Sequence, residues 1–193
     1  MTKILIFSGD NGLSLGEHGL FGKQNLYEFG GMHCPLVIVG PGIPQGRSGA
    51  LVYLMDLFPT LAEFAGAKVP VGVEGQSIVP ILTGKQTNVR DVLYTAYRNC
   101  QRAIRDDRWK LIRYPLVDRT QLFNLSVDPH ELNNLAGKPE HKAKVAAMTE
   151  LLQKEMTRHA DTFPLTVTHT KSAEWSPPAA DSETKKKANR KAK

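Results

Sequence analysis

Two short stretches of the chain consist almost wholly of apolar residues, and neither alternates with polar positions. The first covers Lys3–Phe7 and the second covers Pro35–Val39. Apolar runs of this length without alternation are typical of strands buried on both faces, as in a parallel sheet. The Gly-rich segment between them has little helical or strand period, and a long segment of this kind within a compact domain is usually functional. The pattern therefore predicts two buried strands joined by a functional loop.

A helical period follows further along the chain. Asp56 is a candidate N-cap, Pro59 falls in the first turn, and Gly66 is a natural stop after the helix. These signals predict a helix over residues 57–65 that buries one apolar face. That face comprises Leu57, Leu61, Phe64 and Ala65.

From Val92 the pattern changes to short strand-like runs separated by turns. They predict a small antiparallel sheet, followed by an amphipathic helix from Glu140 to His159. The helix carries Val145, Met148, Leu151, Leu152 and Met156 on one face. We therefore divide the chain into residues 1–66, 67–165 and 166–193. The four predicted strands are Val92–Tyr97, Gln101–Arg105, Trp109–Tyr114 and Gln121–Leu125.

Composition places the chain among ordinary globular proteins. Of its 193 residues, 41% are hydrophobic and 23% are charged, and no run approaches the roughly 20 apolar residues that span a bilayer. The first residues lack the features of a signal peptide. Cys34 and Cys100 are too few for a disulfide framework, and we interpret them as ordinary free cysteines.

The net charge of +6 comes largely from a Lys-rich C-terminal tail. This tail has almost no apolar content, so residues 166–193 are predicted to be disordered and basic. Such a tail can attract polyanions weakly, but a solvated, dispensable segment is the favoured interpretation. We expect no nucleic-acid partner, because no aromatic platform accompanies the basic residues.

The loop after the first apolar run contains the candidate chemistry. Asp10 and Asn11 supply the oxygen ligands that Ca²⁺ or Mg²⁺ prefers, and Lys23 supplies a cation nearby. Ligands of open α/β sheets bind outside the carboxyl ends of strands, where these residues are expected. Asp-Asn-Gly is also a common turn sequence, and Lys23 by itself is an ordinary surface lysine. The residues alone leave both interpretations open.

Several motifs in this loop and beyond it resemble those of one enzyme family, and they occur in the order found there. The chain resembles the C-terminal part of type I sulfatases, which belong to the alkaline phosphatase superfamily and hydrolyse sulfate esters. The resemblance implies an α/β fold, the C-terminal part of an alkaline-phosphatase-like sandwich, plus a small antiparallel sheet with a C-terminal helix. The motifs are Gly9-Asp10-Asn11-Gly12, Leu15-Gly16-Glu17-His18-Gly19, Gly22-Lys23-Gln24-Asn25-Leu26-Tyr27-Glu28, Met55-Asp56-Leu57-Phe58-Pro59-Thr60-Leu61, Gly75-Gln76-Ser77 with Leu82-Thr83-Gly84, Trp109-Lys110-Leu111-Ile112, and Gln121-Leu122-Phe123-Asn124-Leu125 with Asp128-Pro129-His130-Glu131.

The resemblance also implies roles for single residues. Asp10 and Asn11 would complete the coordination of one divalent cation, usually calcium, and Lys23 would contact the sulfate group or its bridging oxygen. His18 is a candidate proton donor or sulfate contact, or else a loop histidine that holds Glu17 or a backbone carbonyl. His33 departs from the arginine that many sulfatases carry at this place, so an arginine contact is not expected there.

Other residues of the motifs have structural interpretations. Tyr27, Glu28 and Gly31 are expected to order the loop. Lys110, beside Trp109, is expected to extend its charged end to solvent from a packed strand. Asp128, Pro129 and Glu131 resemble a turn that leads into a helix.

Two elements of the sulfatase site are not found in this sequence. Sulfatases form their nucleophile, a formylglycine, from a cysteine in Cys-x-Pro-x-Arg, and neither Cys34 nor Cys100 lies in that motif. The paired aspartates that complete the metal site are not found after an early strand. The chain therefore holds about half of the expected protein ligands, and by itself it should bind metal weakly.

The resemblance predicts hydrolysis of a small-molecule or carbohydrate sulfate ester in the complete form, with the formylglycine on an N-terminal sulfatase segment that this sequence does not include. Hydrolysis of phosphodiesters or phosphonates is an alternative, as is a non-catalytic remnant or binding module. Relatives of this kind are commonly periplasmic or secreted, although no signal peptide begins this chain.

Overall fold

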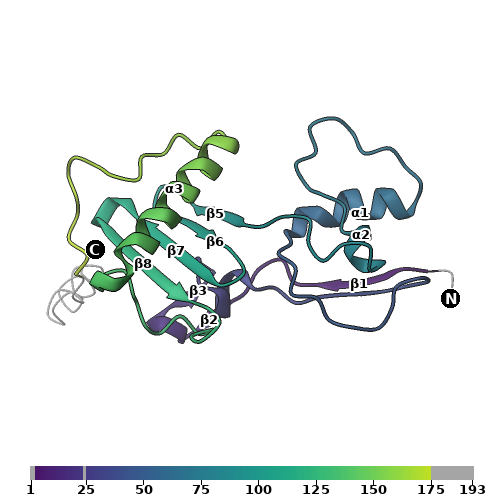
Figure 1. Cartoon of the computed structure of the whole chain (residues 1–193), viewed down its shortest axis with the longest axis horizontal. Coiled ribbons are helices and arrows are strands. Elements are labelled where there is room, and N and C mark those ends of the chain that lie inside the picture. The colour runs from purple at the N-terminus through teal and green to yellow at the C-terminus, as the bar shows by residue number, and fades with distance from the viewer. Residues whose placement is uncertain (1–2, 24, 175–193) are drawn as a thin grey trace, which may run out of the picture.

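The structure is a computed structural model that describes residues 3–23 and 25–174, so most of the predicted tail lies outside the described residues. Figure 1 shows two groups of elements, a sheet crossed by one long helix and a smaller group around β1, α1 and α2. Within the described ranges, no helix has the length and apolar character needed to cross a membrane. The strands and α-helices are β1 (Leu5–Ser8), β2 (Ser14–Leu15), β3 (Phe21–Gly22), β4 (Leu36–Val39), α1 (Leu57–Phe64), α2 (Val79–Leu82), β5 (Leu93–Tyr97), β6 (Gln101–Arg105), β7 (Trp109–Tyr114), β8 (Arg119–Asn124) and α3 (Lys142–Arg158). Single turns of helix cover Glu17–Gly19, Glu28–Met32, Leu54–Asp56, Pro115–Val117 and Pro139–His141.

The predicted sheet and C-terminal helix are confirmed. Strands β5, β6, β7 and β8 pair with their neighbours in chain order, and every pair is antiparallel. Helix α3 lies across one face (Figure 1) and buries Met148, Leu152 and Met156 against Ile104, Leu111 and Leu122. Strand β8 begins at Arg119, two residues before the predicted start, because Asp118 takes the left-handed turn (φ 47°) that reverses the chain.

The other face of this sheet is covered by the loop that carries the candidate site. Leu26 and Tyr27 pack there against Ala103, Ile112 and Phe123. Alternate residues of β6 and β7 therefore face α3 and the loop, and both sets are buried. The sheet is thus the middle of three layers, and its packing holds the loop in place.

The two N-terminal strands are antiparallel, which corrects the expected parallel arrangement. Leu5 lies opposite Val39 and Ser8 lies opposite Leu36. Beyond the strands, the Gly9 N–H donates to the Pro35 carbonyl, so the intervening segment continues the ribbon. A parallel pair needs a crossover connection, usually a helix of several turns. The segment between β1 and β4 contains only single turns and the β2–β3 hairpin.

Strands β1 and β4 are not buried on both faces within this chain, contrary to the prediction for their apolar runs. Leu5, Phe7, Val37 and Val39 are 48–67% exposed. Helix α1 shows the same feature, since Leu61 of its predicted apolar face is exposed while Pro59 and Thr60 are buried. Exposed apolar side chains grouped in this way are typical of interaction surfaces.

Asp56 occupies the predicted N-cap position of α1, but its side chain forms no capping hydrogen bond with that helix, and the preceding turn over Leu54–Asp56 leaves it in helical conformation. Its fully buried carboxylate instead accepts hydrogen bonds from the backbone N–H groups of Tyr53 (2.7 Å) and Gln76 (2.8 Å). Both outer nitrogens of Arg90 donate to it as well, at 2.5 and 2.7 Å. The predicted stop at Gly66 is confirmed, with a φ of 66°.

Candidate functional site

The candidate site begins where β1 ends, and it brings Asp10 and Lys23 together. The Lys23 Nζ atom lies 3.0 Å from Asp10 Oδ1, and both side chains are largely exposed. The hydrogen bond and the positive charge of Lys23 lower the pKa of Asp10 below its usual value. The carboxylate is therefore ionised and already next to a cation.

Asn11 lies beside this pair and is held by the loop backbone. Its Oδ1 accepts a hydrogen bond from the Gly12 N–H at 2.8 Å. The Gly12 N–H also lies 2.7 Å from the Gly31 carbonyl, and a Cβ at Gly12 would lie 2.7 Å from the Gly31 nitrogen. Only glycine allows the two arms of the loop to approach this closely. The Asn11 oxygen retains a second lone pair for another partner.

The donor atoms fit part of a calcium shell. Asp10 and Asn11 offer one carboxylate and one amide oxygen, whereas Ca²⁺ takes six to eight oxygen ligands. Over residues 3–23 and 25–174, no group of three or more His, Cys, Asp or Glu side chains is placed to hold a metal. The chemistry of these two donors therefore suits part of a calcium shell.

His18 is grouped with different residues from Asp10 and Lys23. It lies in the turn between β2 and β3, and its ring stacks on Tyr27 with centroids 3.8 Å apart and planes 7° apart. Glu17, which His18 could have held, instead accepts a hydrogen bond from the Leu15 N–H at 2.6 Å. Strand β3 leads from this turn directly to Lys23, so the hairpin connects the two positions.

Hydrogen bonds within the loop fix its shape, in agreement with the expected role of its Tyr, Glu and Gly residues. The buried Asn25 donates to Ser14 Oγ at 2.9 Å, and Ser14 donates to the Gly30 carbonyl at 3.0 Å. The Tyr27 hydroxyl donates to Gln121 Oε1 of β8 at 3.0 Å. The loop is thus fastened both to itself and to the sheet beneath it.

A buried ion network forms the strongest link between the loop and the sheet. Lys110 Nζ lies 2.8 Å from Glu28 Oε1 and 3.0 Å from Glu131 Oε1, and its side chain is 2% exposed. Arg105 pairs with the second oxygen of Glu28, and the Glu28 N–H donates to Glu131 Oε2 at 2.5 Å. The interpretation of Lys110 as a lysine that extends to solvent is therefore wrong, as is the purely turn-forming role given to Glu131.

The two carboxylates of this network respond differently to burial. Burial alone would raise the pKa of Glu28, but the charges of Lys110 and Arg105 outweigh it and the pKa is lowered. Burial raises the pKa of Glu131, and Lys110 offsets this only in part. Glu131 is thus the member of the network that depends most on Lys110.

The pattern of residues around Lys110 in β7 could have predicted that this lysine is buried. Both faces of β7 carry apolar residues, and Lys110 lies on the same face as the buried Ile112. A lysine on a face that the loop covers must find a buried anion. No comparable local signal indicated the burial of Glu131, because its partners Lys110 and Glu28 lie on other elements of the chain.

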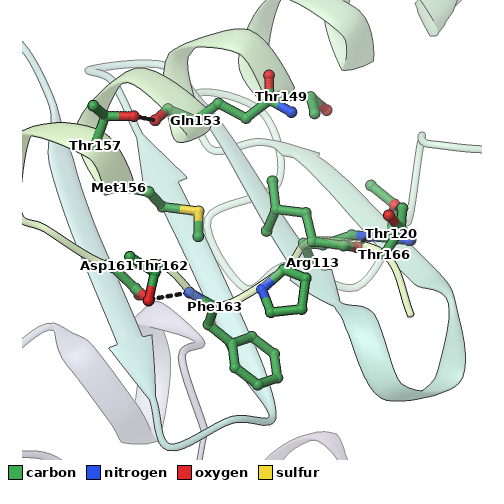
Figure 2. Close-up of a pocket in the computed structure, with 12 residues that line it drawn as sticks. Arg113, Thr120, Thr149, Gln153, Met156, Thr157, Asp161, Thr162, Phe163 and Thr166 are labelled. Carbon is green, nitrogen blue, oxygen red and sulfur yellow. Dashed lines mark hydrogen bonds between the residues drawn. The ribbon is translucent and has the colours of Figure 1, made fainter. Parts of the chain in front are cut away.

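Two cavities adjoin these elements. The first, about 550 Å³, lies between α3 and the segment that follows it (Figure 2). Its polar groups are paired with one another, since Arg113 donates to the Leu165 carbonyl and to Thr120, and Asp161 accepts from the Phe163 N–H. The second, about 360 Å³, lies between the His18–Tyr27 stack and the ends of β6, β7 and β8.

Comparison with known proteins gives the family. Residues 16–158 match the family described as N-sulphoglucosamine sulphohydrolase, C-terminal. The chain belongs to the sulfatase family. It corresponds to the C-terminal part of a sulfatase, and its motif residues from Gly16 to Glu131 fall within the matched range. The resemblance found in the sequence is therefore confirmed.

Individual relatives agree with this assignment. The sulfatase chain is 30% identical to N-acetylglucosamine-6-O-sulfatase of Bacteroides thetaiotaomicron over 83% of its own length and 31% of that protein. It is 38% identical to choline-sulfatase of Rhizobium meliloti over 76% of its length and 29% of that protein. The chain thus spans about a third of the length of these curated relatives.

Solved structures give the same fold. A 2-O GAG sulfatase matches 93% of the chain with a TM-score of 0.76 and 25% identity, and 43% of that structure is covered. A phosphonate monoester hydrolase from Silicibacter pomeroyi matches 83% of the chain with a TM-score of 0.71 and 25% identity, and 36% of that structure is covered. The expected fold class, the C-terminal part of an alkaline-phosphatase-like protein, is confirmed.

Proposed function

We propose that the complete protein hydrolyses sulfate monoesters, and that this chain supplies the part of the active site formed by Asp10, Asn11 and Lys23. The observation that carries the proposal is the Asp10–Lys23 pair at the end of β1, 3.0 Å apart, in which Lys23 lies within the range that matches the sulfatase family. Family membership and the names of the relatives support sulfate esters over phosphonates, although two structural neighbours are phosphonate monoester hydrolases.

Each residue of the proposed site has a defined task. Asp10 and Asn11 would hold a divalent cation, Ca²⁺ or Mg²⁺, through hard oxygen donors. The cation would polarise the sulfate group when bound. Lys23 would exchange its pairing with Asp10 for the bridging oxygen of the ester, where its charge offsets the negative charge that develops as the alcohol leaves.

We propose that the nucleophile comes from an N-terminal sulfatase segment that carries Cys-x-Pro-x-Arg. The exposed apolar side chains of β1, β4 and α1 support this arrangement, because they offer a surface for such a segment. His18 remains a candidate proton donor or sulfate contact. Its place in the hairpin that ends at Lys23 supports a role close to the substrate.

The experiment joins this chain with the N-terminal part of a sulfatase relative, produced where the cysteine is converted to formylglycine. We expect turnover of 4-nitrophenyl sulfate by the assembled protein and little or none by the chain alone. Lys23→Ala should reduce the rate constant at least about a hundredfold, as loss of one group that stabilises transition-state charge does elsewhere. Lys68→Ala, at another exposed lysine, is the matched control and should leave the rate unchanged.

Two results would count against the proposal. Turnover by the chain alone, lost in Lys23→Ala, would show that the chain needs no other nucleophile. An assembled protein that folds and binds Ca²⁺ but turns over no sulfate ester would favour the non-catalytic alternative. Ca²⁺ binding is measured by titration calorimetry, with Asp10→Asn expected to weaken it.

A further inference from the structure

The position of Lys23 depends on the part of the chain that follows it. Before Lys23 lies the β2–β3 hairpin, whose strands are joined by two residue pairs, and the Lys23 side chain is 50% exposed. Its partner Asp10 instead continues the β1–β4 ribbon, because the Gly9 N–H donates to the Pro35 carbonyl at 3.2 Å. A hairpin as short as β2–β3 leaves the place of Lys23 to the residues after it, which pack on the C-terminal sheet.

Glu28, which follows Lys23 within the same loop, is the charged anchor of this segment. Its Oε1 atom lies 2.8 Å from Lys110 Nζ, and its Oε2 atom pairs with Arg105. The Glu28 backbone N–H donates to Glu131 Oε2 at 2.5 Å, so both the side chain and the main chain of Glu28 are held. Lys110 also contacts Glu131 at 3.0 Å and thereby links both carboxylates to β7.

This ion network holds the loop in a different way from the apolar contacts beside it. Leu26 and Tyr27 already attach the loop to the sheet through hydrophobic packing, which has no preferred direction. Charges that are buried together cannot be separated without a large cost, so they allow one arrangement of the two segments. In some proteins buried ionic groups fix the register of neighbouring segments rather than add stability. The network is thus suited to setting where the loop lies on the sheet.

We propose that Lys110, Glu28 and Glu131 are positioning residues that keep Lys23 at the place from which it reaches the ester. They act through Lys23, because they fix one end of the short segment whose other end is the β2–β3 hairpin. A displacement of about 1 Å at a reacting group can reduce a rate about a hundredfold. The inference rests on the proposed function for the role of Lys23, and it adds residues that lie beneath the loop.

The first test is a double-mutant cycle in the assembled protein, with 4-nitrophenyl sulfate as the substrate. Lys110→Met should lower kcat about ten- to a hundredfold and change KM less than about threefold, because Lys23 acts mainly on the charge of the transition state. In the Lys23→Ala background the same substitution should lower kcat less than about twofold, because the residue through which Lys110 acts is gone. Equal losses of kcat in the two backgrounds would overturn the inference.

Further variants separate positioning from stability, at a temperature where all of them are folded. Asp56→Asn breaks a different buried ion pair and should leave kcat unchanged. Glu131→Gln added to Lys110→Met should recover part of the lost stability but not kcat, because Glu28 still lacks its lysine. Lys110→Arg keeps a cation at this place and should recover part of kcat. A kcat that follows stability through this series would show a merely structural role and overturn the inference.

The chain alone gives a readout that does not depend on hydrolysis. The NMR order parameter of the Lys23 backbone N–H should fall from near the rigid value of about 0.85 towards about 0.6 in Lys110→Met, and it should stay unchanged in Asp56→Asn. A Lys23 signal that is already flexible in the parent chain, or unchanged in Lys110→Met, would refute the inference alone, even if the assembled protein turns over sulfate esters. The expected fall without any turnover by the assembled protein would refute the proposed function and leave the positioning of Lys23 supported.

Discussion

Replacing Lys110 with methionine should destabilise the protein strongly, because it removes the cation between two buried carboxylates. Lys110 contacts Glu28 at 2.8 Å and Glu131 at 3.0 Å, and its side chain is 2% exposed. Arg105 still neutralises Glu28 in the variant, so the uncompensated charge is that of Glu131, whose side chain is fully buried. Removing one partner of a buried pair costs about 3–5 kcal/mol of unfolding free energy. For a protein of this size, this lowers the melting temperature by roughly 10 °C.

The pH dependence of this loss gives a sharper test. Burial already raises the pKa of Glu131 in the folded protein, and without Lys110 it should rise further. A carboxyl group with a raised folded pKa binds its proton more tightly in the folded state. The stability deficit of Lys110→Met should therefore shrink as pH falls from 7 towards the unfolded value near 4.5, where Glu131 is neutral in the folded variant.

The assay is urea unfolding of both proteins at several pH values, followed by circular dichroism. Lys154→Met, at an exposed position of α3, is the matched control and should unfold like the parent protein. Adding Glu131→Gln to Lys110→Met should recover part of the loss at pH 7, because it removes the unpaired charge. A deficit below about 1 kcal/mol, or one that is the same at pH 5 and pH 7, would refute the reasoning.

Three further predictions concern other parts of the chain. Asp56→Asn should reduce the free energy of unfolding by about 3 kcal/mol, because Arg90 would lose its buried anion; denaturant titration measures this. Burial acts to raise the pKa of Asp161, but hydrogen bonds from Arg102 and Tyr94 outweigh it and lower that pKa. The stability Asp161 contributes is thus present above about pH 4 and lost below it, and Asp161→Asn should flatten that acid limb of a pH–stability curve. Amide hydrogens before Gly66 should exchange faster than those of β5–β8, or the chain should self-associate through the exposed residues of β1 and β4, and slow, uniform exchange in a monomer would contradict this.

Local signals in the sequence were sufficient for the C-terminal half. The four strand-like runs and the apolar face of α3 predicted the sheet and its covering helix, because strands and a helix that pack together leave a regular pattern of apolar residues along the chain. Gly66 follows the end of α1 as predicted, because glycine adopts the positive φ needed there without steric cost. Ordered motifs gave the family and placed Asp10, Asn11 and Lys23 in one loop, where Asp10 and Lys23 are paired.

The tertiary structure alone decided how distant segments meet. Glu28 and Lys110 are 82 positions apart, and no local pattern pairs them. The antiparallel pairing of β1 and β4 depends on the path of the loop between them, which the packing of Leu26 and Tyr27 on the sheet fixes. Asp56 is at the predicted N-cap position of α1, but in the folded chain its carboxylate is a buried anion for Arg90 and forms no capping hydrogen bond with that helix. Propensity and periodicity are properties of neighbouring residues, whereas buried charges and pairing direction depend on which surfaces the folded chain brings together.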